Sequence, residues 1–213
     1  MEFKRARSEE QFLFRKQEII NCAVKIYDES GYEGMNFSRI SEITNFTRPT
    51  IYKYFATKEE IMLSLVLKYT DELIAYVDKE IQILEEISNE SISNILTRAI
   101  QIVPNFMNCY SILYSVLEKN VSLDALVEFK KEWRARQITL RTHLTQLFPT
   151  LNDDEIHEFL VKYFSYASGL YPMCNKTQIQ RDALRKAGIP DIQISFSNYF
   201  EPILLKLLED LHD

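Results

Sequence analysis

The sequence predicts an all-α protein with a three-helix N-terminal helix-turn-helix domain and a larger helical C-terminal domain. Apolar residues recur at three- and four-residue spacing along most of the chain. Capping residues and prolines stand where these runs begin and end. Only four of the 213 residues are glycine, which argues against a sheet-rich chain with many tight turns. We place the two domains at residues 1–65 and 66–213.

The first expected helix begins at about Ser8 and ends at Gly31, because glycine favours helix C-termini. Its apolar positions are Ile19, Ile20, Ala23, Ile26 and Tyr27.

A second, shorter helix follows the cap Asn36. Phe37, Ile40 and Ile43 are spaced by three, so we expect them on its buried side.

A tight turn and a second short helix come next. Asn45 stands where the turn needs a residue that tolerates a left-handed backbone. Thr47 can cap the helix, and Pro49 fits its first turn because no helical donor is lost there. We expect Ile51 and Phe55 to face inward. Thr50, Tyr52, Lys53 and Tyr54 are left facing outward or sideways.

The stretch Thr57–Glu60 has the pattern of a capping box and opens a third, longer helix. Hydroxyl groups, positive charge and tyrosines thus gather on one short helix before it. That combination fits a DNA groove better than a reaction centre.

The stretch from Gly31 to Ile61 resembles the N-terminal domain of the TetR family of bacterial regulators. The resemblance rests on Tyr52-Lys53-Tyr54-Phe55, which ends the short helix, and on the following Lys58. Two positions depart from the family pattern: Asn45 replaces the usual turn glycine and Ser41 the usual alanine. We expect the Ser41 hydroxyl to bond back to its own helix.

The resemblance implies roles for individual residues. Arg48 would reach the O6 and N7 acceptors of guanine, and the two tyrosines and Lys58 would contact phosphates. The full expected DNA-binding set is Ser38, Arg39, Thr47, Arg48, Thr50, Tyr52, Lys53, Tyr54 and Lys58. The arm Lys4–Arg7 either enters a minor groove or is a solvated tail, and the sequence leaves both open.

The net charge of −6 is uneven along the chain. Residues 1–65 hold ten basic and ten acidic residues, while residues 66–213 hold 15 and 21. Because salt screens distant charges within about 8–10 Å, local placement controls attraction to phosphate. A neutral N-terminal domain predicts modest non-specific affinity with strong salt dependence.

The C-terminal part reads as a series of helices with recognisable ends. Expected spans are 58–87, 90–103, 105–118, 122–148, 152–171, 178–187 and 192–211. Pro104, Pro149 and Pro172 mark three of the stops.

Two of these helices carry apolar stripes too wide for one contact face. Paired across a two-fold axis they would form a four-helix homodimer interface, as the resemblance implies, with packing inside one subunit as the alternative. The expected interface residues are Phe159, Tyr163, Leu170, Phe196, Phe200, Ile203, Leu204 and Leu207. A dimer would bind a near-palindromic double-stranded DNA operator.

An effector pocket is expected between the C-terminal helices. Aromatic faces with a few polar tips are typical of small-molecule sites, although the same residues also suit an ordinary core. The candidates are Met107, Tyr110, Tyr114, Phe129, Trp133, His143 and Phe164.

The sequence therefore predicts a homodimeric transcriptional regulator, a repressor released by a small-molecule effector. A DNA-binding protein of chromosome organisation and a helical protein–protein adaptor are the alternatives. Nothing indicates an enzyme, because glycine-rich phosphate loops and the HExxH and GxSxG patterns are missing. The three scattered cysteines suggest no metal site, and no cofactor is expected. Since no stretch reads as a signal peptide or a membrane span, we expect a cytoplasmic protein.

Overall fold

The computed structural model describes the backbone of residues 2–211 and the side chains of residues 9–211. Within that range all regular secondary structure is helical and there is no β-strand. No helix there is long and apolar enough to cross a membrane. The chain divides into two compact units: residues up to Lys68 together with Leu113–Lys131, and Tyr69–Ile112 together with residues from Glu132 onward. The all-α expectation is confirmed.

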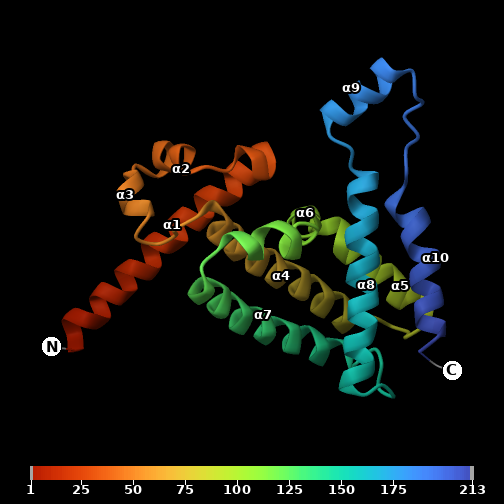
Figure 1. Cartoon of the computed structure of the whole chain (residues 1–213). Coiled ribbons are helices and arrows are strands. Elements are labelled where there is room, and N and C mark those ends of the chain that lie inside the picture. Colours follow the sequence, from red (N-terminus) through yellow and green to blue (C-terminus); the bar gives the residue numbers. More distant parts are fainter. Residues whose placement is uncertain (1, 212–213) are drawn as a thin grey trace. The chain divides into compact units, whose positions relative to one another are not determined.

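The first unit opens with four helices (Figure 1). They are α1 (Glu2–Gly34), α2 (Phe37–Thr44), α3 (Arg48–Ile51) and the beginning of α4 (Lys58–Gln82). The backbone of α1 kinks at Gly31, where φ is 61°, so the expected helix end is a bend followed by one more turn. Side chains of the arm Lys4–Arg7 lie outside the described residues, although its backbone belongs to α1.

A buried apolar centre joins these helices. Ile26, Ile40, Ile51 and Ile61 are fully covered by their neighbours. Ile43 was expected beside Ile40 but is 50% exposed. A step of three residues falls about 60° short of a full helical turn, so the third residue of the series has rotated off the buried side.

The remaining helices are α5 (Asn89–Ile102), α6 (Pro104–Tyr110), a π-helical turn η1 (Leu113–Leu117) and a 3₁₀ turn η2 (Glu118–Asn120). They are followed by α7 (Leu123–Leu144), α8 (Asp153–Cys174), α9 (Gln178–Ala187) and α10 (Phe196–Glu209). In the second unit, α10 packs on α5 and α8, and α6 packs on α8.

Several expected helix ends were wrong. Residues 105–118 are not one helix, because α6 stops at Tyr110. The backbone then widens into the π-helical turn η1 and tightens into the 3₁₀ turn η2. The last helix starts at Phe196, because Ser195 caps it: its Oγ accepts the Asn198 N–H at 3.4 Å. α4 and α7 also end earlier than expected, at Gln82 and Leu144.

Pro172 does not stop α8, which continues to Cys174. Proline has no N–H for the carbonyl four residues earlier, here that of Ser168. Ser111 Oγ lies 3.2 Å from this Ser168 oxygen and 2.7 Å from the Met107 carbonyl oxygen. Its single proton is therefore shared between the Ser168 oxygen and the carbonyl of its own helix.

Candidate nucleic-acid interface

The turn between α2 and α3 has the backbone that the sequence predicts. Asn45 has φ 59° and ψ 11°, in the left-handed region. The Ser41 hydroxyl donates to the Phe46 carbonyl at 2.6 Å, so it spans the turn and does not bond back within α2 as expected. Asn36 caps α2 by accepting the Arg39 N–H at 3.0 Å, which confirms that prediction.

The α3 helix is short and firmly seated. Thr47 Oγ1 accepts the Thr50 N–H at 3.3 Å, which confirms the expected cap. Although the helix ends at Ile51, the N–H groups of Tyr54 and Phe55 both bond to the Ile51 carbonyl, at 2.9 and 3.1 Å. Ile51 and Phe55 are buried as predicted. These two anchors fix which side of the helix faces outward.

Four of the predicted DNA-binding residues are exposed: Thr47, Arg48, Tyr52 and Lys53. Tyr52 is 58% exposed although its ring rests edge-on against Phe37 of α2, with centroids 4.7 Å apart. This contact orients the ring and leaves its hydroxyl end in solvent, as a phosphate contact would require.

The other five predicted residues are half-buried: Ser38, Arg39, Thr50, Tyr54 and Lys58. Thr50 is engaged with the cap, since its Oγ1 lies 2.9 Å from Thr47 Oγ1. Tyr54 packs on Phe12 of α1 with centroids 4.6 Å apart. Its ring therefore also supports the domain.

Arg39 joins α2 to the end of α1. Its Nη2 lies 3.0 Å from Glu29 Oε2 and its Nη1 donates to Ser30 Oγ at 2.7 Å. A phosphate contact by Arg39 would compete with the Glu29 carboxylate.

Lys58 lies at the first turn of α4, with its Nζ 3.8 Å from the centre of the Tyr32 ring and 3.4 Å from the Tyr32 carbonyl oxygen. The Tyr32 hydroxyl donates to Glu59 Oε1 at 2.6 Å. Desolvation, together with this hydrogen bond and the nearby carboxylates, raises the pKa of Tyr32 to about 12. The ammonium is thus held on an aromatic face next to α3.

A second contact holds the start of α4. Glu60 Oε2 accepts the Ala56 N–H at 2.6 Å, and Glu60 Oε1 accepts the Ser122 hydroxyl at 3.3 Å. Thr57 Oγ1 accepts the Glu60 N–H at 3.2 Å and donates to the Asn120 carbonyl at 3.1 Å. The expected capping box exists in shifted form, since Glu60 bonds to residue 56 and not 57.

The sequence analysis named neither Asn120 nor Ser122 as a functional residue. Ser122 caps α7, because its Oγ accepts the Ala125 N–H at 3.3 Å. No sequence signal identifies the other role, since residues 120–122 reach α4 through a contact sixty-two residues away in the chain.

The seven predicted effector residues are divided between the two units. In the second unit, Tyr110 lies 6.1 Å from Trp133 and 5.3 Å from Phe164 between ring centres. Phe106, which the sequence analysis did not include, joins them 5.6 Å from Phe164. Met107 is fully buried in the same unit. We call Phe106, Tyr110, Trp133 and Phe164 the aromatic cluster.

The other three predicted effector residues have contacts of a different kind. Tyr114 and Phe129 belong to the first unit, where both rings face the Lys130 ammonium at 5.3 and 5.8 Å. His143 lies in the second unit with Nδ1 2.9 Å from Asp78 Oδ1, a contact between α7 and α4. A pocket lined by all seven residues stays a prediction.

Most of the predicted dimer residues are not on the surface. Phe159, Tyr163, Leu170, Phe196, Phe200 and Leu204 are all buried inside the single chain. Neighbouring helices of the same unit cover them; Tyr163, for example, donates its hydroxyl to the Leu96 carbonyl of α5 at 2.7 Å. A partner cannot reach these six side chains. Ile203, 39% exposed, and the half-buried Leu207 remain accessible.

Family models match both parts of the chain. The model described as bacterial regulatory proteins, tetR family, matches residues 19–65. The model described as tetracyclin repressor-like, C-terminal domain, matches residues 68–209, which is more than half of the chain.

Two curated proteins are similar in sequence. The biofilm operon icaADBC HTH-type negative transcriptional regulator IcaR of Staphylococcus epidermidis is 23% identical over 149 residues, which is 70% of this chain and 69% of IcaR. The fatty acid metabolism regulator protein of Bacillus subtilis is 32% identical over 65 residues, 30% of this chain. The match spans only 34% of that regulator.

Solved structures share the fold. A regulator of the TetR/AcrR family from Thermobifida fusca superposes with a TM-score of 0.54 at 22% identity, over 91% of this chain and 96% of that one. A TetR-family regulator from Mesorhizobium loti superposes with a TM-score of 0.52 at 16% identity, over 94% and 96% of the two chains.

Proposed function

This chain belongs to the TetR family of bacterial transcriptional regulators, and from that membership we propose that it is a homodimeric repressor that a small-molecule effector releases from DNA. The observation that carries the proposal is the anchoring of α3. Buried Ile51 and Phe55 hold a short capped helix that presents Arg48 and Lys53 to solvent. IcaR, a relative, is by its description a negative regulator, which supports repression.

Reading of the operator is assigned to Arg48 and its neighbours. Arg48 stands at the N-terminus of α3, where a guanidinium can bond bidentately to guanine in the major groove. Lys53, Tyr52 and Lys58 supply phosphate contacts, which position the domain without reading sequence. Two such domains would meet half-sites about 34–36 Å apart, and the operator would be near-palindromic. Because the proposed target is bacterial DNA, we expect the protein in the cytoplasm.

The dimer would use the outward sides of α8 and α10. Val161 and Tyr199 are 51% and 55% exposed there, and Ile203 lies on the same helix as Tyr199. Ser165 and Gly169, which follow Val161 on α8 at four-residue spacing, are exposed and leave room for close approach of a second helix. This face replaces the buried residues expected from the sequence.

The effector would bind at the aromatic cluster, where a Tyr hydroxyl and a Trp N–H accompany apolar faces. Tyr110 is the last residue of α6, and Trp133 lies in α7. The chain between them contains Asn120 and Ser122, which hold Thr57 and Glu60 after α3. A ligand that favours one spacing of Tyr110 and Trp133 would therefore bias the start of α4. The bias cannot exceed its preference for one state over the other.

DNase footprinting of the DNA beside its own gene tests the proposal. One near-palindromic footprint that disappears when cell extract is added supports a ligand-released regulator. Many scattered footprints would indicate chromosome organisation, and their complete absence would indicate a protein–protein adaptor. The Arg48→Ala variant serves as the control, since it should need a higher protein concentration to give the footprint while keeping its fold.

Trp133 offers a direct test of the effector site, because it is the only tryptophan of the chain. Fractions of the extract that abolish the footprint should also change its fluorescence. If they release DNA with unchanged Trp133 emission, and Phe164→Ala does not weaken that release, the ligand binds elsewhere.

A further inference from the structure

Helix α9 lies beyond the C-terminal end of α8 and away from the rest of its unit (Figure 1). None of its ten residues is buried. Isolated helices shorter than about 12–15 residues are marginal in water. A short helix with one apolar side that the described part of the chain covers only partly is suited to a partner surface.

The apolar side of α9 borders a groove of about 610 Å³ next to the end of α8. Met173, Leu184, Ile189 and Ile194 are among the side chains that line it. Met173 is 57% exposed and connects the groove to the outward side of α8. The groove is thus continuous with the face proposed above for dimerisation.

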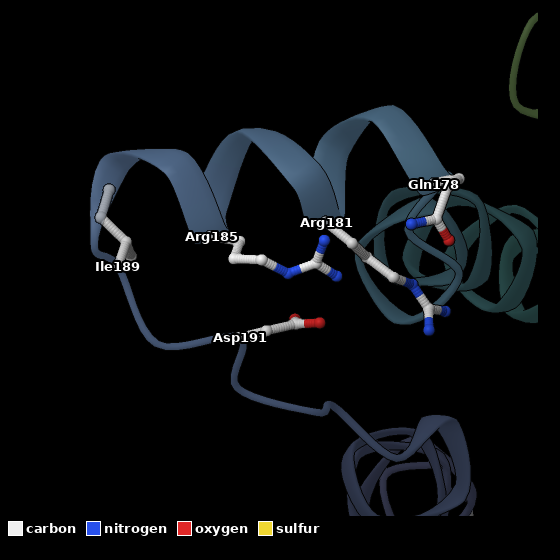
Figure 2. A pocket seen from close by; sticks show the side chains of 5 residues that line it. All are labelled: Gln178, Arg181, Arg185, Ile189 and Asp191. Carbon is white, nitrogen blue, oxygen red and sulfur yellow. The ribbon is translucent and has the colours of Figure 1, made fainter.

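The other side of α9 is basic. Figure 2 shows Arg185 extending from the helix toward the returning segment that carries Asp191, and both Arg181 and Arg185 line a hollow of about 400 Å³. Arg181 Nε donates to the Lys176 carbonyl at 3.2 Å. Lys176 holds that segment, since its Nζ lies 3.1 Å from Asp191 Oδ1 and donates to the Ile192 carbonyl at 2.7 Å. Arg185 Nη1 lies 2.8 Å from Asp182 Oδ1 of the same helix, and the Arg185 side chain is largely exposed. We call residues 176–194 the α9 arm, which is distinct from the N-terminal arm Lys4–Arg7.

The opposite end of the α8 and α10 pair is acidic. Exposed Asp153, Asp154 and Glu155 begin α8, and exposed Glu209 and Asp210 end α10. α8 has 22 residues and is therefore about 33 Å long, whereas the ten residues of α9 span about 15 Å. The basic α9 arm cannot reach the acidic end of its own subunit. A second copy running in the opposite direction would bring the two together.

We propose that the α8 helices of two copies cross antiparallel near Ser165, so that each α9 arm clasps the acidic end of its partner. The inference rests on the proposed homodimer. Met173 and His157 each lie eight residues from Ser165, and Lys176 and Asp154 each lie eleven. The crossing therefore sets Met173 against the partner's His157, and the α9 arm against the partner's Asp154. The groove covers apolar surface near the partner's Val161, and the charges fix the antiparallel direction.

Thiol cross-linking between subunits tests this arrangement. Cys174→Ser removes the one cysteine that is not buried, since Cys22 and Cys109 are covered. In this background, one tagged chain carries Arg185→Cys and a differently tagged, co-expressed chain carries Asp154→Cys. Both positions are exposed, so neither change should affect folding. A short bis-maleimide should give a linked dimer that contains both tags.

The controls separate the possible outcomes. Arg185→Cys paired with the exposed Arg134→Cys should give no linked product. Linkage of two Arg185→Cys chains to each other would indicate parallel α8 helices and overturn the proposal. A protein that elutes as a dimer but is not linked through 185 and 154 would also overturn it, while the proposed function would stand. A monomer in sizing would instead contradict the homodimer itself.

Charge reversal provides an independent measurement. Arg181→Glu with Arg185→Glu should raise the dimer dissociation constant by about tenfold, less at high salt. A mixture of this chain with one carrying Asp153→Lys and Asp154→Lys should recover much of the affinity. Equal dissociation constants for all these pairs would contradict the clasp.

Discussion

Ser122 Oγ donates to Glu60 Oε1 at 3.3 Å, and this bond joins the first residue before α7 to the first turn of α4. The other oxygen of the same carboxylate holds the Ala56 N–H, in the loop that follows α3. One side chain therefore connects the end of the exposed helix with a segment that continues into α7. The π-helical turn at Leu113–Leu117 precedes that segment, and such turns frequently lie at functional sites.

The Ser122–Glu60 bond should be measurable as a coupling energy. Ser122→Ala should lower the free energy of unfolding by about 1 kcal/mol through the lost cap, and by about 0.5–1.5 kcal/mol more through the lost bond. In a double-mutant cycle with Glu60→Gln, urea unfolding should show non-additivity of about 0.5–1.5 kcal/mol.

The matched control is Ser88→Ala, which removes the cap of α5 in the second unit. It should lower stability to a similar degree and leave operator affinity unchanged. Ser122→Ala should reduce operator affinity as well. Strict additivity with Glu60→Gln, or equal operator affinity in both serine variants, would contradict the role given to this bond.

Arg48 and Lys58 should affect DNA binding in different ways. Arg48→Ala should cost about 1–3 kcal/mol on the preferred operator and relax preference at one base pair, with no change in melting temperature, because the side chain is exposed. Lys58→Met should weaken all sequences alike and lower the salt slope by about one. Gel-shift titrations at several salt concentrations measure both effects.

Lys58→Arg is the control for Lys58→Met, since it keeps the charge and the contact with the Tyr32 ring. It should retain most of the salt slope. An unchanged slope in Lys58→Met would remove this residue from the phosphate contacts.

Arg39 can act as a structural bridge between α1 and α2 or as a phosphate contact, and a Glu29 variant distinguishes these two roles. Arg39→Ala should destabilise the first unit, because the residue bridges α1 and α2 through Glu29 and Ser30. The ion pair is substantially exposed, so the loss should be under about 1 kcal/mol. Glu29→Gln removes the competing carboxylate and keeps Arg39. If Arg39 contacts phosphate, this variant should bind DNA more tightly at low salt. Equal affinity would restrict Arg39 to a structural role.

Tyr32 should make stability fall at alkaline pH. Its folded pKa of about 12 lies above the usual value of 10, so between these pH values the unfolded chain releases a proton that the folded chain keeps. The contribution of the protonated Tyr32 to the free energy of unfolding is therefore complete below pH 10 and is lost as pH rises toward 12. Melting temperatures should drop less steeply from pH 9.5 to 11.5 in Tyr32→Phe than in the wild type. Parallel curves would refute the assignment, since the other tyrosines are common to both proteins.

Local features were predictable from the sequence. Asn36 and Thr47 cap the helices that they precede, and α9 has the expected bounds of 178–187. These elements depend on neighbours within a few residues, where capping geometry dominates. The family resemblance of residues 31–61 followed from the same short stretch, which the model for residues 19–65 confirms.

Longer-range features were not predictable in the same way. Periodicity correctly marked Phe159 and Tyr163 as apolar positions, but it cannot tell whether α5 and α10 of the same chain or a second subunit covers them. Likewise, composition could not separate Tyr110 and Trp133 from Tyr114, because only the fold places Tyr114 in the other unit.

Asn45 should determine how well the turn before α3 is held. With φ at 59° the backbone is left-handed, a conformation that costs an ordinary residue about 1–2 kcal/mol and costs asparagine less. Asn45→Ala should therefore lower the free energy of unfolding by about 1 kcal/mol, and a β-branched Asn45→Val by more. Asn45→Gly should be close to the wild type, because glycine tolerates this backbone but has more freedom to lose on folding. Because the turn sets where Thr47 and Arg48 lie, operator affinity should follow the same order in gel-shift titrations. Equal stability of Asn45→Ala and the wild type would show that the turn adopts a different backbone.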